Sequence, residues 1–547
     1  MTDQQRQDHL SCYNDKMVLK TPFIDSIAEE GVKFTNFYCN NPICMPNRST
    51  IYTGQYPSVH GVISNGRNLP QDTRTFVDIL RESGYQTASF GKIHLNYFGI
   101  PHDKFPDVIE SQEFTLAKDY PKLTDHSPYF GLEDVKLVSG HGYICGHPDY
   151  LNWVISKVKN DESGLLGKTF RANRENAEEK ITEKLDFGKG INLIKLTRVA
   201  KSQLNLQVVA NRIPEELYST TFVKENTIDF LKRFAEGKVQ KENFFTFCSF
   251  PDPHHPFSPP GKYFDMYKPE DVLLPNSFND THEKSPEFMK KHYVETVNSD
   301  GTVKGLFPNP KDVTELEAKR VIAASYGMEK MMDDAVGEIL NVLEETGLAE
   351  NTVIIYTTDH GELGGDHRFF FKGPFLYQAL AKIPFLMKVP NGLKDQASKS
   401  LASSIDIPET ILELAGIEVP DSMQGKSLVP ILSNPKTELN KDVLIEMDDE
   451  IMDETSRTLI ANDWRMTVFG TEDEGELYDL REDSEEMNNL WHDNSFFDKK
   501  LELTIKLLNK GILTDEKPSE TDLSYNLKLI RDAMASYKSP IHRDCQF

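Results

Sequence analysis

A short run of residues near the amino terminus combines a nucleophile with a permanent positive charge. Cys44 and Arg48 are the ends of the run Cys-Met-Pro-Asn-Arg, within a segment, 40–54, that is typical of a loop entering a helix near Ser49. Amide groups at a helix amino terminus favour an anion, and an arginine one turn later is always charged. A lone cysteine is more often a small buried residue. Together with Arg48, however, the pattern indicates a side chain that acts on an anionic group.

Two acidic residues, each followed by a polar partner, have side chains that bind divalent cations. Asp3 precedes Gln4, and Asp359 precedes His360. Carboxylate, amide and imidazole groups are common ligands of divalent metals. Glycines follow His360 closely, and glycine lets the backbone approach a ligand. Either pair alone is as often structural, so the sequence predicts a metal site if the fold brings both pairs together.

Further basic residues have the spacing expected for binding an anionic substrate and moving protons. Lys92 and His94 are two residues apart, which places them on one face of an extended segment. His254 follows an apolar run, and imidazole titrates near neutrality. Lys372 comes shortly after the second candidate metal pair; a lysine among aromatic residues usually extends its amine to solvent. These side chains are candidates for the same site.

The segments that carry these residues alternate between helical and extended patterns. The longest helical pattern runs from 316 to 345, and the apolar run 353–356 is typical of a strand buried in a parallel sheet. Functional groups collect at the carboxyl ends of such strands, where Asp359 lies. The chain is therefore expected to be α/β. The other elements predicted here are helices at 21–31 and 76–83 and strands at 32–38, 85–90 and 244–250.

The pattern changes near residue 420, which predicts two domains. A chain of 547 residues is too long for one simple core. We assign 1–420 to a catalytic α/β domain, interrupted at about 106–211 by an irregular insertion with a charged stretch at 171–189. We assign 421–547 to an α+β subdomain built on a short antiparallel sheet. Its predicted strands are 443–446, 457–460, 464–469 and 476–480, and its predicted helices are 497–508 and 526–537.

Composition argues against two classes of partner. The 61 Lys and Arg against 86 Asp and Glu give a net charge of −25, whereas nucleic-acid binding needs clustered positive charge. No apolar run approaches the roughly 20 residues that span a bilayer. The six cysteines lack C-x-x-C spacing, and the chain opens without the basic and apolar segments of a signal peptide. A cytoplasmic protein without nucleic-acid or membrane partners is expected.

These motifs, in this order, resemble the sulfatase family of the alkaline phosphatase superfamily. The run that starts at Cys44, followed by Thr53-Gly54, is similar to the C-x-P-x-R and T-G elements of that family. The resemblance extends from residue 1 to about 495. It implies a large mixed, mostly parallel sheet between layers of helices, as in alkaline phosphatases, and a smaller α+β subdomain. The other matching motifs are Asp3-Gln4, Gly91-Lys92-Ile93-His94, Pro253-His254-His255-Pro256, Asp359-His360-Gly361-Glu362, Lys372 and Glu476-Leu477-Tyr478-Asp479-Leu480.

The resemblance implies hydrolysis of a small sulfate monoester after oxidation of Cys44. In this family a formylglycine-generating enzyme converts the cysteine to an aldehyde, which hydrates to a diol. One hydroxyl attacks sulfur with the help of a metal and forms a covalent enzyme-sulfate intermediate; deprotonation of the other releases sulfate. Calcium is the expected metal, and manganese is the alternative. The implied metal ligands are Asp3, Gln4, Cys44, Asp359 and His360.

The resemblance also implies roles for the basic residues. Arg48 would orient the diol, His94 would be the base that releases sulfate, and His254 would protonate the leaving alcohol. Two lysines would stabilise the charge on sulfate oxygens. The implied substrate-binding residues are Lys92, His254, Lys372 and Asn65.

The chain departs from the family pattern at three places. Gln4 replaces an acidic ligand and His360 replaces an asparagine, which makes the metal site less anionic. Asn47 stands where serine is commoner. The buried strand that precedes the first ligand in the family has no counterpart before Asp3. We therefore expect either a longer natural start or a weaker site.

Two other functions fit part of the pattern. A phosphonate monoester or phosphodiester hydrolase of the same superfamily shares the C-x-P-x-R nucleophile, but it carries uncharged residues at the positions of Lys92 and His94. An inactive homologue that binds a sulfated ligand is the second alternative. Specificity is expected to reside in the insertion at about 106–211 and in the carboxyl-terminal segment, where the resemblance is weakest. The insertion residues His141, His147 and Tyr150 are expected to pack or to lie at the surface rather than line the pocket.

Overall fold

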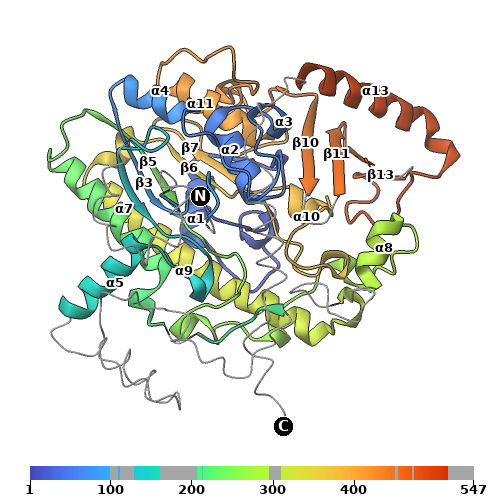
Figure 1. Ribbon diagram of the computed structural model, residues 1–547, viewed down its shortest axis with the longest axis horizontal. Coiled ribbons are helices and arrows are strands. Elements are labelled where there is room, and N and C mark those ends of the chain that lie inside the picture. Colours follow the sequence, from blue (N-terminus) through green and yellow to red (C-terminus); the bar gives the residue numbers. More distant parts are fainter. Residues whose placement is uncertain are drawn as a thin grey trace, which may run out of the picture.

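The structure is a computed structural model (Figure 1). Its described part is α/β, with mixed sheets between helices and a separate antiparallel sheet near the carboxyl terminus. No helix of this part is long and apolar enough to cross a membrane. Most of the expected insertion and the helix expected at 526–537 lie outside the described residues. The described residues are 1–98, 109–110, 128–160, 206–211, 213–294, 309–449, 454–470 and 474–514.

Two groups of strands form the centre of the fold. In the first, β3 pairs in parallel with β4 and with β5. In the second, β7 runs antiparallel to β6 and β1, and β8 runs parallel to β1. A short parallel pair, β2 and β9, lies beside them. The strands are β1 (Val32–Phe34), β2 (Phe37–Tyr38), β3 (Tyr85–Gly91), β4 (Asp134–Leu137), β5 (Asn243–Ser249), β6 (Ile354–Thr357), β7 (Phe385–Lys388), β8 (Gln396–Ser398) and β9 (Ala402–Ser403).

The first residues of the chain connect the two groups of strands. The Met1 amine donates to the Cys248 carbonyl at 2.8 Å, and the Phe250 amide donates to the Met1 carbonyl at 2.9 Å. On the other side, Thr2 forms a parallel bridge with Thr358. The Asp3 amide then donates to the carbonyl of Asp252, at 3.1 Å. The candidate metal ligand Asp3 is thus held between β5 and β6 by backbone hydrogen bonds, and does not hang on an unattached end.

Helices cover both faces of the central strands, and β5 shows how. On one face, Phe247 stacks on Tyr52 of α2, with 5.5 Å between ring centroids. On the other, Phe244 contacts Phe230 of α7 edge to face. Apolar residues on alternate sides of one strand are expected for a strand buried on both faces. Helices near the first face are α2 (Cys44–Thr53), α4 (Phe76–Glu82) and α11 (Ile407–Leu414); those near the second are α1 (Pro22–Glu29), α7 (Ser219–Ala235) and α9 (Glu315–Glu345) (Figure 1).

The predicted elements of this region are confirmed, with three corrections. Strand β6, predicted within a parallel sheet, runs antiparallel to its partner β7, whereas the bridge between Thr358 and Thr2, directly after β6, is parallel. Helix α2 begins at Cys44 and not near Ser49, because Pro46 lies in the first turn, where proline needs no amide hydrogen. The strand predicted at 32–38 is divided into β1 and β2. Between them the Thr35 amide donates to the Ser398 carbonyl, and the partner strand changes from β8 to β9.

The carboxyl-terminal part contains an antiparallel sheet, as predicted. Its strands pair in chain order, and α13 covers the sheet through Leu503. Arg465 is buried there between Glu476, at 2.8 Å, and Glu486. Glu486 also accepts the amide hydrogen of Gln378 at 2.7 Å, which joins this sheet to the catalytic part. The elements not yet named are β10 (Asp442–Asp449), β11 (Glu454–Ala461), β12 (Trp464–Phe469), β13 (Gly475–Asp479), α3 (Pro57–His60), α5 (Pro148–Asn160), α8 (Glu287–Val294), α10 (Gln378–Ala381), α12 (Val429–Ser433) and α13 (Phe497–Thr514).

Candidate active site

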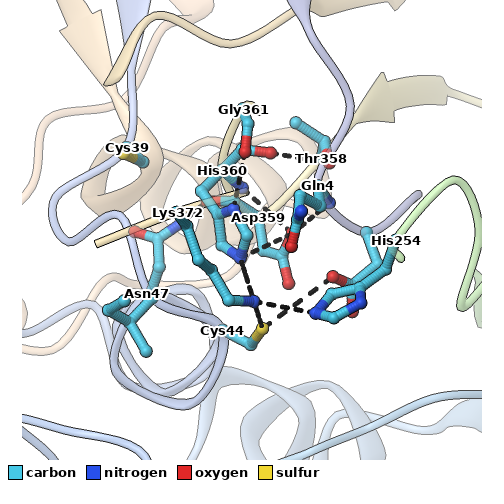
Figure 2. A network of polar contacts seen from close by, with 12 residues as sticks. Gln4, Cys39, Cys44, Asn47, His254, Thr358, Asp359, His360, Gly361 and Lys372 are labelled. Carbon is cyan, nitrogen blue, oxygen red and sulfur yellow. Dashed lines mark hydrogen bonds and ion pairs between the residues drawn. The ribbon is translucent and has the colours of Figure 1, made fainter. Parts of the chain in front are cut away.

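The predicted reactive side chains meet at the carboxyl ends of the central strands. Lys92 and His94 follow β3, and His254 follows β5. Asp3 lies in the amino-terminal segment, and Asp359 follows β6. Cys44 is the first residue of α2. Lys372 reaches the same point from the loop after β6 (Figure 2). The fold thus brings together residues that are far apart in the sequence, at the strand ends where α/β sheets bind ligands.

A compact donor set surrounds Cys44. One ligand atom each from Asp3, Cys44, Asp359 and His360 lie within 4.8 Å of one another, and all four residues are buried. The Nδ1 of His360 lies 2.9 Å from the Gly361 carbonyl. A proton on Nδ1 would satisfy that carbonyl and leave the Nε2 lone pair free for a metal. This arrangement fits one divalent cation.

The Gln4 side chain has an orientation that suits a metal ligand. Its Nε2 donates to the carboxylate of Glu362 and lies 3.0 Å from Nδ1 of His255. Its Oε1 is buried and has no hydrogen-bond partner among the described residues. Its backbone amide donates to Asp359 at 3.0 Å. An amide whose nitrogen is occupied by two acceptors presents its oxygen to the remaining side, so the orphaned Oε1 suits a cation.

Arg48 binds both aspartates. Its Nε donates to Oδ2 of Asp359 at 2.8 Å, and its Nη2 donates to Oδ2 of Asp3 at 3.3 Å. Its Nη1 donates to the Lys92 carbonyl at 2.9 Å and to the Ser249 hydroxyl at 3.1 Å. Burial disfavours the charge on Asp3, but neighbouring cations hold the pKa of this carboxyl well below its usual range. The described contacts of Arg48 therefore orient the two candidate metal-binding carboxylates; its contact with the oxidised Cys44 stays a prediction.

Lys372 is the basic residue nearest to the Cys44 sulfur. Its Nζ lies 2.7 Å from Sγ of Cys44, 3.0 Å from Nε2 of His254 and 3.1 Å from Nε2 of His360 (Figure 2). Burial opposes both charges, yet the pKa of Lys372 is raised and that of Cys44 is lowered, because ammonium and thiolate stabilise each other. The surroundings of Cys44 and His360 thus favour a positive charge, which the Lys372 ammonium supplies in this structure.

The other predicted basic pair lies beside Asp3. The Lys92 ammonium donates to Asp3 Oδ2. Both ring nitrogens of His94 are buried without a hydrogen-bond partner among the described residues. Burial, and then the charge of Lys92, lower the pKa of His94 well below its usual value, which favours the neutral imidazole. Glu110 accepts the backbone amides of His94, Leu95 and Asn96, and so holds this loop in place.

Asn65 and Asn47 support the start of α2. The Oδ1 of Asn65 accepts the amide hydrogen of Met45 at 3.1 Å. The same side chain was predicted to contact the substrate, and that contact stays a prediction. Asn47 is fully buried: its Nδ2 donates to the Asp359 carbonyl and, at 3.0 Å, to the Ser404 hydroxyl. Asn47, at the position where serine is commoner in the family, therefore joins α2 to the loop that carries Asp359 and His360.

Three site residues were missed or given no role from the sequence. His255 and Glu362 orient Gln4, and both lie inside motifs that matched the family. His141 was expected to pack or lie at the surface, but its Nε2 lies 2.7 Å from Nζ of Lys92. The same expectation is confirmed for Tyr150, whose hydroxyl donates to the Leu217 carbonyl. His141 stands alone in an irregular segment, so no local pattern indicated its place.

Comparison with known proteins decides the family. A family model of sulfatases matches residues 1–417. The chain belongs to the sulfatase family. A second model, the carboxyl-terminal part of N-sulphoglucosamine sulphohydrolase, matches residues 365–511 of this sulfatase. The protein is therefore a hydrolase of sulfate esters, as the resemblance implied.

Relatives of this sulfatase cover nearly all of its length. An arylsulfatase from Clostridium perfringens is 26% identical over 536 residues, which are 97% of this chain and 96% of the relative. The structure of BT4656 in complex with D-glucosamine-2-N,6-O-disulfate is 21% identical, with a TM-score of 0.68 over 93% of this chain and 96% of that one. The phosphonate monoester hydrolase of Agrobacterium radiobacter is 24% identical, with a TM-score of 0.69 over 94% of each chain. At these identities, the two structures show the shared fold alone.

Proposed function

We propose that this sulfatase cleaves small sulfate monoesters with a formylglycine made from Cys44. The observation that carries the proposal is the position of Cys44. It is buried at the first residue of α2, among Asp3, Asp359 and His360, with the Lys372 ammonium 2.7 Å from its sulfur. An oxygen nucleophile at this place would lie among the residues that would hold a cation and beside the Lys372 ammonium. That arrangement suits attack on an anionic ester.

One divalent cation fits the donor set, and calcium is the first choice. Two carboxylates and the orphaned Oε1 of Gln4 offer hard oxygen ligands, and His360 adds an imidazole, which keeps manganese as the alternative. When bound, the cation would lower the pKa of a hydroxyl held at the Cys44 position. Arg48, bonded to both aspartates, would keep the carboxylates in place for it.

In the first half of the reaction, protein side chains would bind the sulfate and protonate the leaving group. Lys92 and Lys372 would donate hydrogen bonds to sulfate oxygens, where charge accumulates. A hydroxyl on the oxidised Cys44, once it has released its proton to solvent, would bond through its oxygen to sulfur as the bond from sulfur to the ester oxygen breaks. His254 would give its proton to that ester oxygen. Burial holds the pKa of His254 well below its usual value, and the negative charge of a bound ester would raise it, so substrate binding would supply the acid form.

In the second half, His94 would act as the base. The Cys44 side chain then carries sulfate on one oxygen and a proton on the other. Removal of that proton by the neutral imidazole of His94 would re-form the aldehyde and expel sulfate with the electrons of its bond to carbon. The buried, unpartnered ring of His94 supports this assignment, since neither of its nitrogens is occupied by another described group.

A sulfated sugar is the substrate class that we favour. BT4656, whose structure has the same fold, is described with D-glucosamine-2-N,6-O-disulfate as its substrate. A screen of sulfated monosaccharides, aryl sulfates and choline sulfate, each measured by sulfate release, tests the assignment. Conversion of Cys44 is tested separately by the mass of its tryptic peptide, since oxidation to the aldehyde lowers that mass. A thiol-containing peptide from protein made in its native host would support the inactive, ligand-binding alternative.

Phosphonate ester hydrolysis is the second candidate, favoured by the shared fold. Lys92 and His94 favour sulfate, because both basic side chains are buried in this site and the phosphonate hydrolases that share the motif carry uncharged residues at these two positions. Initial rates on an aryl sulfate and on the matched aryl phosphonate monoester distinguish the two. Faster turnover of the phosphonate would contradict the sulfatase mechanism proposed for this site.

A further inference from the structure

A histidine outside the matched family motifs lies against two of the residues proposed to contact sulfate. His141 follows β4, and its side chain is almost fully buried. Its Nε2 lies 2.7 Å from Nζ of Lys92 and 3.9 Å from Oδ2 of Asp3. Its ring stacks on the ring of His254, with 3.5 Å between centroids and 9° between planes. One imidazole therefore contacts both Lys92 and His254.

The contacts of His141 and His254 form two equivalent pairs. The Lys92 ammonium donates to Nε2 of His141, and the Lys372 ammonium donates to Nε2 of His254 at 3.0 Å. An ammonium has donors only, so each Nε2 must accept, and both rings are neutral in this state. Burial lowers the pKa of both histidines, in agreement with this. Lys92 and Lys372 are thus joined through one stacked pair of rings.

Stacking has a consequence for the acid step. When His254 carries a proton, the face of a neutral imidazole beneath it stabilises the charge, as an aromatic face does for a cation. A second protonated ring at 3.5 Å would repel it. The ammonium of Lys92 keeps His141 neutral, because it occupies Nε2 as a donor.

We infer that His141 is a positioning residue that holds the Lys92 ammonium toward sulfate and fixes the ring plane of His254. The inference rests on the proposed function. Each part of the His141 side chain makes one contact: Nε2 accepts a hydrogen bond from Lys92, and the flat ring stacks on His254. The two contacts can be removed separately.

Two substitutions separate these contacts. His141→Phe keeps a flat ring against His254 but removes the acceptor for Lys92. We expect the KM for sulfate esters to rise about tenfold while the dependence of kcat on the leaving group is unchanged. His141→Asn keeps a polar group but removes the ring. We expect kcat to fall at least tenfold more for a sugar sulfate than for an activated aryl sulfate, because only the former needs the acid His254.

Tyr150→Phe is the matched control, since it removes a buried hydrogen bond in the same part of the chain without touching the site. It should leave both parameters unchanged. Equal losses for the two His141 variants on both substrates, in proportion to a fall in their melting temperatures, would show that His141 only supports the fold. The inference would also be overturned if both His141 variants cleaved both substrates with the kinetics of the wild type.

Binding of inorganic sulfate separates this inference from the proposed function. If the wild-type protein cleaves no sulfate ester, the proposed function fails, but calorimetry with sulfate still tests His141. His141→Phe should weaken sulfate binding about tenfold, while Tyr150→Phe should bind as the wild type does. Equal sulfate affinity for wild type and His141→Phe would contradict the positioning of Lys92.

Discussion

The side-chain amide of Gln4 donates a hydrogen bond to the carboxylate of Glu362, and this contact decides which end of Gln4 faces the donor set. Glu362 is buried and also accepts the amide hydrogens of Gly364 and Phe371. It therefore joins the candidate metal ligand Gln4 to the loop that carries Lys372. A carboxylate in place of Gln4 would face Glu362 with like charge.

Gln4→Glu is therefore expected to weaken the metal site, although it restores the acidic ligand usual in the family. Repulsion from Glu362 should raise the Kd for Ca²⁺ about tenfold, the lower end of the effect of changes around a metal ligand. The double variant Gln4→Glu/Glu362→Gln restores a donor opposite an acceptor and should recover most of the affinity. Calorimetric titration of metal-free protein measures both. Tighter calcium binding by the single variant would contradict the orientation of Gln4.

Cys44→Ala should abolish turnover, because it removes the atom that becomes the nucleophile. We expect kcat to fall by more than about 10⁴-fold, as for other nucleophile deletions. Cys39→Ala is the control: this buried thiol lies near the site but outside the contact network of Cys44 (Figure 2). Sulfate release and melting temperature are measured for both. Activity that survives Cys44→Ala would exclude the proposed mechanism.

Lys372→Ala should lower kcat/KM about 10²- to 10³-fold, because it removes a positive charge where sulfate charge develops. The melting temperature should change little, since this ammonium contacts Cys44, His254 and His360 rather than the hydrophobic core. Lys382→Ala serves as the control, because this lysine is also shielded from solvent but makes none of these contacts. A loss of activity common to both variants would indicate a general effect of removing charge.

His254→Ala should penalise poor leaving groups most, because an activated aryl oxygen leaves without a proton. We expect kcat to fall about 100-fold or more on a sugar sulfate and about tenfold or less on a nitrophenyl sulfate. A series of aryl sulfates of increasing phenol pKa gives the same test as a slope, which should steepen in the variant. A slope equal to that of the wild type would remove His254 from the acid role.

The buried carboxyl of Glu110 should make stability depend on pH. Burial raises its pKa from 4.5 to about 7. A carboxyl with a raised pKa in the folded state stabilises the protein below its unfolded pKa, and this contribution is lost as the pH rises from about 4.5 to about 7. The shift corresponds to about 3 kcal/mol.

Glu110→Gln removes this titration. The difference in free energy of unfolding between wild type and variant should therefore change by up to about 3 kcal/mol across that pH range. Denaturant unfolding at several pH values measures it. The variant should also lower kcat, because one amide oxygen cannot accept all the backbone hydrogens of the loop that holds His94. A constant difference between the two proteins at all pH values would contradict the raised pKa.

The sequence by itself determined the elements and the reactive residues. Helix α9, strand β6 and the motif that begins at Asp359 were predictable because hydrophobic periodicity and chain order are local properties. The family and its candidate ligands followed from motifs and their order along the chain. The start of α2 was placed too late, since Pro46 indicated a loop but is tolerated in a first helical turn.

Only the tertiary structure decided how these residues meet. His141 and His254 stack although 113 positions separate them, and Gln4 bonds to Glu362 across 358 positions. Such contacts depend on which strands become neighbours and on where each loop turns. The sequence around each of these residues therefore does not indicate which residue it will contact. The amino-terminal residues show the same principle: Met1 and Thr2 hold Asp3 because β5 and β6 lie on either side of them, and backbone hydrogen bonds form wherever the fold supplies an edge.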